Sequence, residues 1–502
     1  MKTNKLYTVL VGALVTIGSI SCSDFLDRAP LDQMSSETFW QSEVDVEMAL
    51  TGCYRRLRDE QYFGWKRVDL DCLTDNAQQR HNHGAVTDIS RGVIEKTTGG
   101  IISAIWGSAY KGINTCNYFL ENIARVPGID EQKKNRYMAE ARFLRAFFYF
   151  ELVHFFGDAP LYRDVPTVET ASIRQSPKAE LLAFIHEDLD FAIQQLPDVP
   201  YTDGHVVKGS AQGYKARILM YEEQFAEAAA LCKEIIDAGN FQLGTSYSGL
   251  FITPGQANNP EIMFSTRYVA PDDYTEMDIQ VNWWSSNNPR QEFVDAYETT
   301  DGKAINDASG IYDPDQPYEN RDPRLEMTVM LPDEVWLNPD GSPYTPEHTT
   351  TGYRQKKYID PTIVPIDYAT RSDQDYVHLR FADILLMYAE AQNEANGPDQ
   401  SVIDAINRVR NREDVQMPPV EMEASKDVMR EVIRHERRIE LALEGLRYFD
   451  LKRWHIAHEV MPNVQDAAGV PIRFDNPKHY LWPYQQSELD INPNLEPNPN
   501  YE

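Results

Sequence analysis

Residues 138–156, MAEARFLRAFFYFELVHFF, are the stretch of this chain that decides its fold class. Small or apolar side chains recur there at three- and four-residue steps, at Ala139, Phe143, Ala146, Phe150 and Val153. This is the period of an α-helix with one buried face, and Gly157 follows directly as a stop signal. The stretch therefore predicts a long core helix in a mainly α-helical protein.

Two other stretches have the pattern of paired helices. Within residues 210–240, small and apolar residues fall at the positions of a tetratricopeptide unit, with a turn at Glu223 and Gln224. A looser copy runs over residues 380–412, where Gly397 and the proline after it interrupt the helical pattern. Such pairs cannot close a core alone, so we expect them to stack into a curved scaffold.

The scaffold is predicted to cover about residues 37–240 and 377–460, including single helices at 37–58 and 177–196. Between residues 241 and 376, proline, glycine, asparagine and aromatic residues are dense and the helical period fades. Loops of that length are uncommon unless they have a role. The predicted fold is thus mainly α, with tetratricopeptide-like helix pairs forming a scaffold, short strands, and a long loop-rich insertion at 241–376 that binds the ligand.

Residues 1–21 have the composition of a secretion signal. Lys2 and Lys5 supply the positive start, and the apolar run over residues 6–20 is too short to span a bilayer. Small residues then precede Cys22, which predicts a lipoprotein signal peptide at 1–21 and lipid attachment at Cys22. A free thiol behind a conventional cleavage site is the alternative. The rest of the chain, 22–502, is expected to form a single body.

The chain is strongly acidic. Its formal net charge is −30, and removal of Lys2 and Lys5 with the leader changes this value to −32. An acidic surface repels phosphate backbones and anionic lipids, so we expect no nucleic acid partner and a covalent membrane anchor.

Sequence motifs for catalysis are incomplete. His435 and Glu436 begin like the zinc motif H-E-x-x-H, but Ile439 stands at the second histidine position. We therefore predict a protein that is not an enzyme and needs no cofactor. A glycoside hydrolase needs only two carboxylates at a suitable separation, and the chain has 78 acidic residues, so this alternative stays open.

Metal binding is left open. His81 and His83 form a short histidine pair, and Asp313, Asp315 and Asp322 offer oxygen ligands for an irregular calcium site. Neither group has the spacing of a known metal motif.

Two groups of residues have the composition of a sugar-binding surface, in which rings stack on the sugar and polar side chains take its hydroxyls. The first group, in the insertion, consists of Trp283, Trp284 and Asn287, with Asn282 and Asn288 beside them. The second, in an irregular stretch at 61–100, consists of Trp65, Asp75, Asn76, Arg80 and His81. The alternatives are a buried satellite core for the tryptophans and turn capping for Asp75 and Asn76.

Charged residues are dense near residues 431–447. Three oppositely charged pairs stand three residues apart, namely Glu431 with Arg434, Arg437 with Glu440, and Glu444 with Arg447. This spacing predicts ion pairs along one helix face through residues 434–445.

Seven sequence blocks together resemble the SusD/RagB family of surface nutrient-uptake lipoproteins. They are CSDFLDRAP (22–30), FWQSEVDVEMALTGCYRRLR (39–58), EARFLRAFFYFELVHFFGDAPLY (140–162), RDPRLEMTVM (321–330), RFADILLMYAEAQNEA (380–395), RHERRIELALEGLRYFDLKRW (434–454) and YLWPYQQSELDINPNLEPNPNY (480–501). The resemblance implies a mostly helical fold, a ligand groove built from loops of the two kinds above, and a lipid anchor at the outer membrane. It also implies a partner, a SusC-like TonB-dependent β-barrel, over which the protein acts as a lid.

The expected function is therefore non-catalytic capture of an extracellular oligosaccharide or polysaccharide and its delivery to the SusC-like transporter. The expected location is the cell outer membrane, lipid-anchored and facing the exterior. Capture of peptides, as in RagB-like proteins, is the first alternative. A glycoside hydrolase and a tetratricopeptide scaffold for other surface proteins are the further ones.

Overall fold

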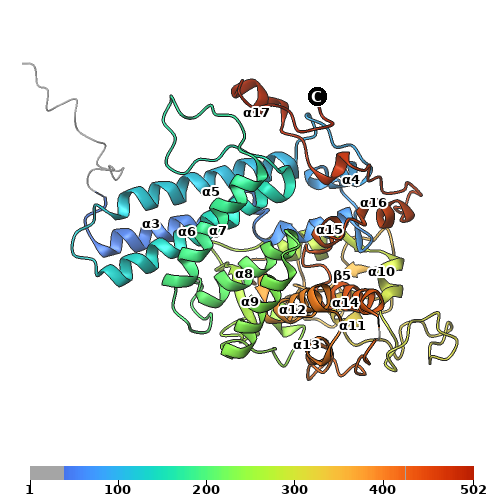
Figure 1. The fold of residues 1–502 in the computed structure, drawn as a ribbon. Helices are drawn as coiled ribbons and strands as arrows, with labels where there is room; N and C mark the ends of the chain where they lie inside the picture. The colour runs from blue at the N-terminus through green and yellow to red at the C-terminus, as the bar shows by residue number, and fades with distance from the viewer. Residues whose placement is uncertain (1–38, 424) are drawn as a thin grey trace, which may run out of the picture.

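The computed structural model describes residues 39–423 and 425–502, so the predicted leader and Cys22 lie outside the described residues. Within them helices dominate and pack on one another into an array, as Figure 1 shows. The array comprises α3 (Glu43–Arg55), α5 (Ile101–Ile123), α6 (Glu131–Phe156), α7 (Lys178–Gln195), α8 (Lys208–Tyr221), α9 (Phe225–Ala238), α12 (Phe381–Asn396), α13 (Gln400–Arg410) and α14 (Lys426–Glu440). The predicted mainly α-helical class is confirmed. None of the described helices has both the length and the apolarity needed to cross a bilayer.

Helix α6 contains residues 138–156, the stretch predicted to form a long core helix. The Asp130 side chain caps its N-terminus by accepting hydrogen bonds from the backbone N–H groups of Gln132 and Lys133, and Gly157 ends it with a φ of 76°. From Tyr137 onward most side chains are buried, on more than the one face that the period predicted. The reason is that α5 and α7 both pack against α6.

Both predicted helix pairs are present. Helices α8 and α9 are joined by a three-residue turn in which Glu223 has a φ of 58°. Helix α12 ends at Gly397, and the Asp399 side chain caps α13. Helix α9 packs against α12, so the two pairs stack although about 140 residues separate them in the chain.

The single helices are also present, with different ends. Helix α3 starts at Glu43, where Ser42 and Asp45 form a capping box, and the predicted start at residue 37 lies outside the described residues. Helix α7 matches the stretch predicted at 177–196.

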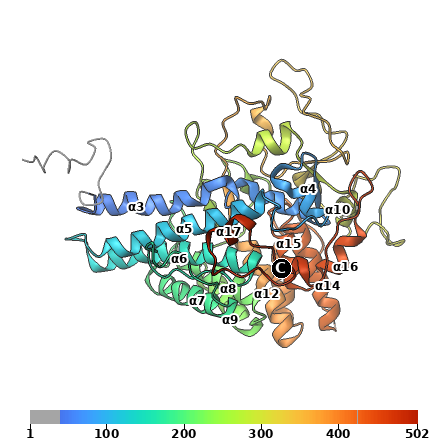
Figure 2. The same cartoon turned by 90° about the horizontal axis from the view of Figure 1, so that it is seen from above.

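Short antiparallel strand pairs hold the irregular segments. They are β1 (Ala77–Gln79) with β3 (Asn287–Pro289), β2 (Ile262–Thr266) with β6 (Tyr376–Arg380), and β4 (Val329–Met330) with β5 (Arg354–Gln355). Residues 241–376 otherwise contain short pieces such as η5 (Asp278–Trp283), α10 (Gln291–Ala296) and α11 (Arg324–Thr328). Figure 2 shows loops of this segment on the side of the molecule away from α7 and α9. The predicted borders between scaffold and insertion stay predictions.

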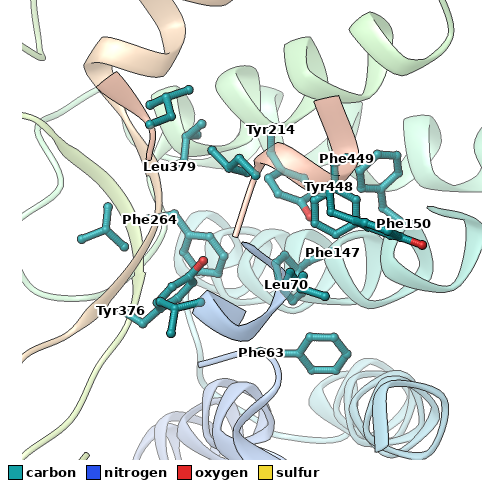
Figure 3. Packing of buried hydrophobic residues seen from close by; sticks show 14 of the residues in the cluster. Phe63, Leu70, Phe147, Phe150, Tyr214, Phe264, Tyr376, Leu379, Tyr448 and Phe449 are labelled. Atoms are coloured by element: carbon teal, nitrogen blue, oxygen red, sulfur yellow. The ribbon is translucent and has the colours of Figure 1, made fainter. Parts of the chain in front are cut away.

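The hydrophobic core joins segments from the whole described chain. Phe147 of α6 packs on Phe264 of β2 with ring centroids 5.6 Å apart, and on His378 of β6 at 5.1 Å. Figure 3 shows the surrounding side chains, which include Phe63, Leu70, Phe150, Tyr214, Tyr376, Leu379, Tyr448 and Phe449. Because β2 and β6 contribute to this core, the scaffold and the segment before α12 are packed together.

A second buried region is ionic. We call it the buried ion network, and it consists of Glu261, Asp322, Arg324, Arg380, Arg410, Arg412, Glu436, Glu440 and Glu444. Glu440 lies at its centre, where its carboxylate accepts hydrogen bonds from Arg380 and Arg412 at 2.7 Å each and from Arg324 at 3.0 Å. Burial raises the pKa of Glu440, but these arginines outweigh burial and hold the pKa well below its usual value.

The network corrects the predicted ion pairs along residues 434–445. Glu431 and Arg434 do pair, at 3.0 Å. The other two predicted pairs are wrong. Arg437 bonds instead to Asp383 and Asp450, and Glu444, which lies beyond the end of α14, bonds to Lys357 and Arg380. On a buried helix face, the elements packed against the helix supply the oppositely charged partners. Burial of a charge is costly without such a partner, so these contacts replace the pairs that spacing along the helix predicted.

Candidate functional site

The pairing of β1 with β3 brings the two predicted groups of binding residues together. Gln79 is opposite Asn287 in this pair, and the Arg80 backbone N–H donates to the Ser286 carbonyl at 2.8 Å. Arg80 and His81 therefore lie beside Trp284, which is about 200 residues away in sequence.

Three aromatic rings meet at this point, and we call them the aromatic cluster: Trp283, Trp284 and Tyr368. The Tyr368 ring is edge-on to both indoles, at centroid distances of 4.6 Å from Trp283 and 5.8 Å from Trp284. Tyr368 is 64% exposed, and both tryptophans are half-buried. The cluster therefore presents apolar ring surface to solvent from a polar loop region.

Polar groups edge the cluster. Arg80 Nη1 donates to the Trp284 carbonyl at 3.0 Å and to Glu347 Oε2 at 2.7 Å. His81 Nε2 lies 3.1 Å from the same Trp284 carbonyl, and the His81 ring is edge-on to the Trp284 indole. A guanidinium, an imidazole and a carboxylate thus border the rings, which is the set of donors and acceptors that hydroxyl-rich ligands use.

The turn after the tryptophans is held in a defined shape. Ser285 has a φ of 46°, and its hydroxyl donates to the Glu347 carbonyl at 2.7 Å. The Glu347 backbone N–H donates to the Trp283 carbonyl at 2.9 Å, and Arg354 Nε donates to Ser285 Oγ at 3.1 Å. These bonds connect the loop at residue 347 to the tryptophans and order both.

Asn287 is not part of the exposed cluster. It is almost fully buried, and its amide Nδ2 donates to Asp69 at 2.9 Å. Burial raises the pKa of Asp69 to about 7, although the hydrogen bond from Asn287 opposes the shift. The Oδ1 atom of Asn287, the Oγ of Ser286 and both amide atoms of Gln79 are buried without a hydrogen-bond partner.

Trp65, Asp75 and Asn76 are also almost fully buried. The Trp65 backbone N–H donates to the Tyr268 hydroxyl at 3.1 Å, and the Asn76 side chain donates to Asp71 at 2.9 Å. In this structure their side chains leave no surface for a ligand.

Asp75 ties the stretch at 61–100 to the C-terminal helices. Its carboxylate pairs with Arg438 of α14 and with Arg447, each at 2.9 Å. Burial raises the pKa of Asp75, but the two arginines outweigh burial and lower the pKa to about 2. The role that the structure supports for Asp75 is therefore structural.

Of the predicted ligand residues, Arg80, His81, Trp283 and Trp284 reach the surface together, and their contact with a ligand stays a prediction. Sequence reasoning missed Tyr368 and Glu347. Both lie in the predicted insertion, but no spacing or motif connects them to the tryptophans, because the contact depends on loop packing.

The residues considered for metal binding have other surroundings. Asp322 is paired with Arg324 at 2.7 Å, and Asp313 accepts from the backbone N–H of Asp315. Within residues 39–423 and 425–502, no group of three or more His, Cys, Asp or Glu side chains is arranged so that it could hold a metal ion.

Comparison with known proteins gives consistent matches over almost the whole chain. A model of the SusD family matches residues 253–501, and a model described as starch-binding associating with outer membrane matches residues 24–220. SusD-like protein P2 of Formosa agariphila is 28% identical over the full length of both chains.

Solved structures agree with the sequence matches. A SusD-like carbohydrate binding protein from Bacteroides fragilis superposes with a TM-score of 0.81 and 31% identity, covering 91% of this chain and all of that one. A second SusD-like protein from Bacteroides fragilis gives a TM-score of 0.80 and 27% identity, covering 94% of this chain and all of that one.

Proposed function

This chain belongs to the SusD/RagB family, and we propose that it captures an extracellular oligosaccharide or polysaccharide at the aromatic cluster and delivers it, without breaking a bond, to a SusC-like TonB-dependent β-barrel. The carbohydrate binding of the similar Bacteroides fragilis protein supports the ligand class.

The observation that carries the proposal is the aromatic cluster itself. Its three rings expose apolar surface beside Arg80, His81 and Glu347, and a sugar ring has an apolar face edged by hydroxyls. When a sugar stacks on an aromatic ring, its apolar face is buried. The polar side chains beside the rings can then exchange hydrogen bonds with the sugar hydroxyls. The net gain per hydrogen bond is only about 0.5–1.5 kcal/mol, so binding of each sugar is expected to be weak.

The proposal includes lipid attachment at Cys22 and exposure of the described body to the cell exterior.

The test is removal of the two indoles. Trp283→Ala with Trp284→Ala is expected to abolish retardation in polysaccharide-containing native gels and heat release in titration calorimetry against plant, host and microbial polysaccharides. Tyr118→Ala is the matched control, since Tyr118 is an exposed ring on α5, outside the cluster. Unchanged binding of a glycan that the wild type retains would overturn the proposed site.

Other outcomes would replace the function. Binding of peptides but not glycans by the wild type would favour the peptide-capturing alternative, and release of reducing ends by purified protein would favour a glycoside hydrolase. Failure of the membrane-extracted protein to copurify with a TonB-dependent barrel would remove the delivery step and favour a scaffold.

A further inference from the structure

A separate pocket of about 180 Å³ lies between the C-terminal part of α6, the first residues of α7, the end of α8 and α15 (Arg447–Arg453). Its walls include His154, Lys178, Tyr221, Glu222, Lys452 and His455. A cavity needs only about 10–15 Å³ of such volume to hold one water, so this pocket has room for a small ion with its hydration. None of these residues belongs to the aromatic cluster.

Lys452 forms the inner wall and is 5% exposed. Its ammonium donates to the His154 carbonyl at 3.2 Å and lies over the rings of Tyr448 and Phe155 at 5.1 and 5.7 Å. Among the described residues, no carboxylate lies within 4 Å of it. This is unusual for a buried cation, because burial of a charge is costly without an opposite charge.

Lys357 is the matched comparison within the same protein. It is also buried, but its ammonium bonds to Glu444 at 2.8 Å and to the Ala442 carbonyl at 2.9 Å. The chain has 78 acidic residues, and still, among the described residues, none pairs with Lys452. The pocket beside Lys452 is therefore a place where a negative charge would be stabilised.

Two more residues with polar groups line the same pocket, namely His154 and Lys178. His154 Nε2 is buried without a hydrogen-bond partner, and Lys178, at the first turn of α7, is exposed and has no ion pair among the described residues. The Nε2 nitrogen of a neutral histidine can carry the ring proton and donate it. The two ammonium groups and the ring nitrogen come from three different helices.

The other charged and titratable groups around the pocket are engaged elsewhere. Glu222 lies 2.5 Å from His186 Nε2, and Arg453 is paired with Glu390 and Asp450. His455 Nε2 is 3.8 Å from Glu223, and the Tyr480 hydroxyl bonds to His458. The Arg453 guanidinium, which could bind a planar carboxylate through two parallel hydrogen bonds, is thus already paired. The remaining donors at the pocket are single, separate groups.

We infer that this pocket binds a tetrahedral oxyanion, a sulfate or phosphate group, held by Lys452, Lys178 and His154. The oxygens of a sulfate or phosphate group can accept hydrogen bonds from donors that approach from different directions, as these three residues do. The group is either a free ion or an ester on a larger molecule, and the chemistry at the pocket is the same for both.

Titration of Lys452 provides a signature for the site. Burial, with the nearby Lys178 charge, lowers the pKa of Lys452 to about 7, and burial lowers the pKa of His154 well below its usual value. A bound anion favours the charged ammonium and raises the Lys452 pKa. Binding should therefore take up protons near neutral pH and weaken as the pH rises through 7.

The experiment is calorimetric titration of the purified protein with sodium sulfate, at constant ionic strength set by sodium chloride. We expect saturable binding at pH 6 and about tenfold weaker binding at pH 8, because the charged fraction of a group with a pKa of about 7 falls about tenfold between them. Lys452→Met, which keeps the length of the stem, should abolish binding, and Lys178→Met should weaken it. Lys233→Met is the control, since Lys233 is exposed on α9 and paired with Asp237, and it should bind like the wild type.

Absence of saturable binding of both inorganic sulfate and glucose 6-sulfate by the wild type, or equal binding by Lys452→Met and Lys233→Met, would overturn the inference. If Lys452→Met does not fold, two other results decide. Proton uptake by the wild type, measured in buffers of different ionisation enthalpy, and weaker binding by Lys178→Met support the site, and the absence of either contradicts it.

Two further ligands identify the source of the anion. Glucose 6-sulfate, compared with glucose, tests an ester, and inorganic sulfate tests a free ion. Binding of glucose 6-sulfate that Lys452→Met loses assigns the pocket to a substituent, and binding of inorganic sulfate alone assigns it to a free ion. The double variant of Trp283 and Trp284 should leave both unchanged, so this inference and the proposed function can fail separately.

Discussion

The buried ion network and the aromatic cluster both join segments that are distant in sequence, but they treat polar groups in opposite ways. In the network, each carboxylate accepts from at least one arginine, and Glu440 accepts from three. At the cluster, Tyr368 is mostly exposed and the two indoles are half-buried. The difference teaches that a region whose carboxylates all have buried arginine partners holds the fold, whereas a region with rings exposed to solvent is free to meet a ligand.

The largest effect is expected from breaking the network. Arg380→Met would leave Glu440, Glu444 and Glu261 short of a partner in a dry region, and removal of one member of a buried ion cluster costs about 3–5 kcal/mol. Urea unfolding followed by circular dichroism measures the loss. A cost below about 1 kcal/mol would mean that the network is no more important for stability than a surface pair.

A smaller and pH-dependent effect is expected at Asp75. Its pKa of about 2 lies below the unfolded value near 3.9, so its stabilisation is present above pH 4 and is lost as the pH falls toward 2. Asp75→Asn should lower the free energy of unfolding by about 2 kcal/mol at pH 7. Denaturation at pH 7, 4 and 3 should show the gap to wild type narrowing with acid, and a constant gap would contradict the role of the charge.

At the cluster the expected effect falls on binding and not on stability. Tyr368→Ala removes a ring that is 64% exposed, so the free energy of unfolding should change by less than about 0.5 kcal/mol. Loss of one stacking ring should weaken glycan binding about five- to tenfold, which is about 1 kcal/mol. Calorimetry with a glycan that the wild type binds, and Tyr118→Ala as control, tests this. An intact affinity would exclude Tyr368 from the site.

The smallest effect is expected at the exposed ion pair of Arg80 and Glu347. Its 2.7 Å distance is as short as those in the network, but the side chains are 15% and 45% exposed. Solvent screens such a pair, so Glu347→Gln should change the free energy of unfolding by less than about 1 kcal/mol, and less still at high salt. Thermal unfolding at two salt concentrations measures it. A loss as large as that of Arg380→Met would remove the contrast between the two regions.

Several elements could be predicted from local sequence alone. The period through 138–156, the stop at Gly157 and the break at Gly397 correctly marked α6 and the α12–α13 pair. Partner choice could not be predicted in this way. Spacing paired Arg437 with Glu440, but tertiary packing gave Glu440 to arginines from β6, α11 and the segment after α13.

In the candidate site, too, some residues could be predicted from the sequence and others depend on tertiary packing. Composition pointed to Trp283, Trp284, Arg80 and His81, and the β1–β3 pair brings them together. Composition also pointed to Trp65, whose burial no local pattern reveals. Tyr368 and Glu347 could not be found in this way, because they reach the cluster only through loops that fold back on it.

The sequence by itself determined several helices, among them α6 and the α8–α9 and α12–α13 pairs, and the family resemblance, because a helix is built from hydrogen bonds between residues four apart and its signals are equally local. Only the tertiary structure decided which charges are paired, which tryptophans face solvent, and that Lys452 is buried beside a pocket with no carboxylate within 4 Å of its ammonium among the described residues. Those properties depend on which elements pack against a side chain, and packing partners in this protein lie up to hundreds of residues away.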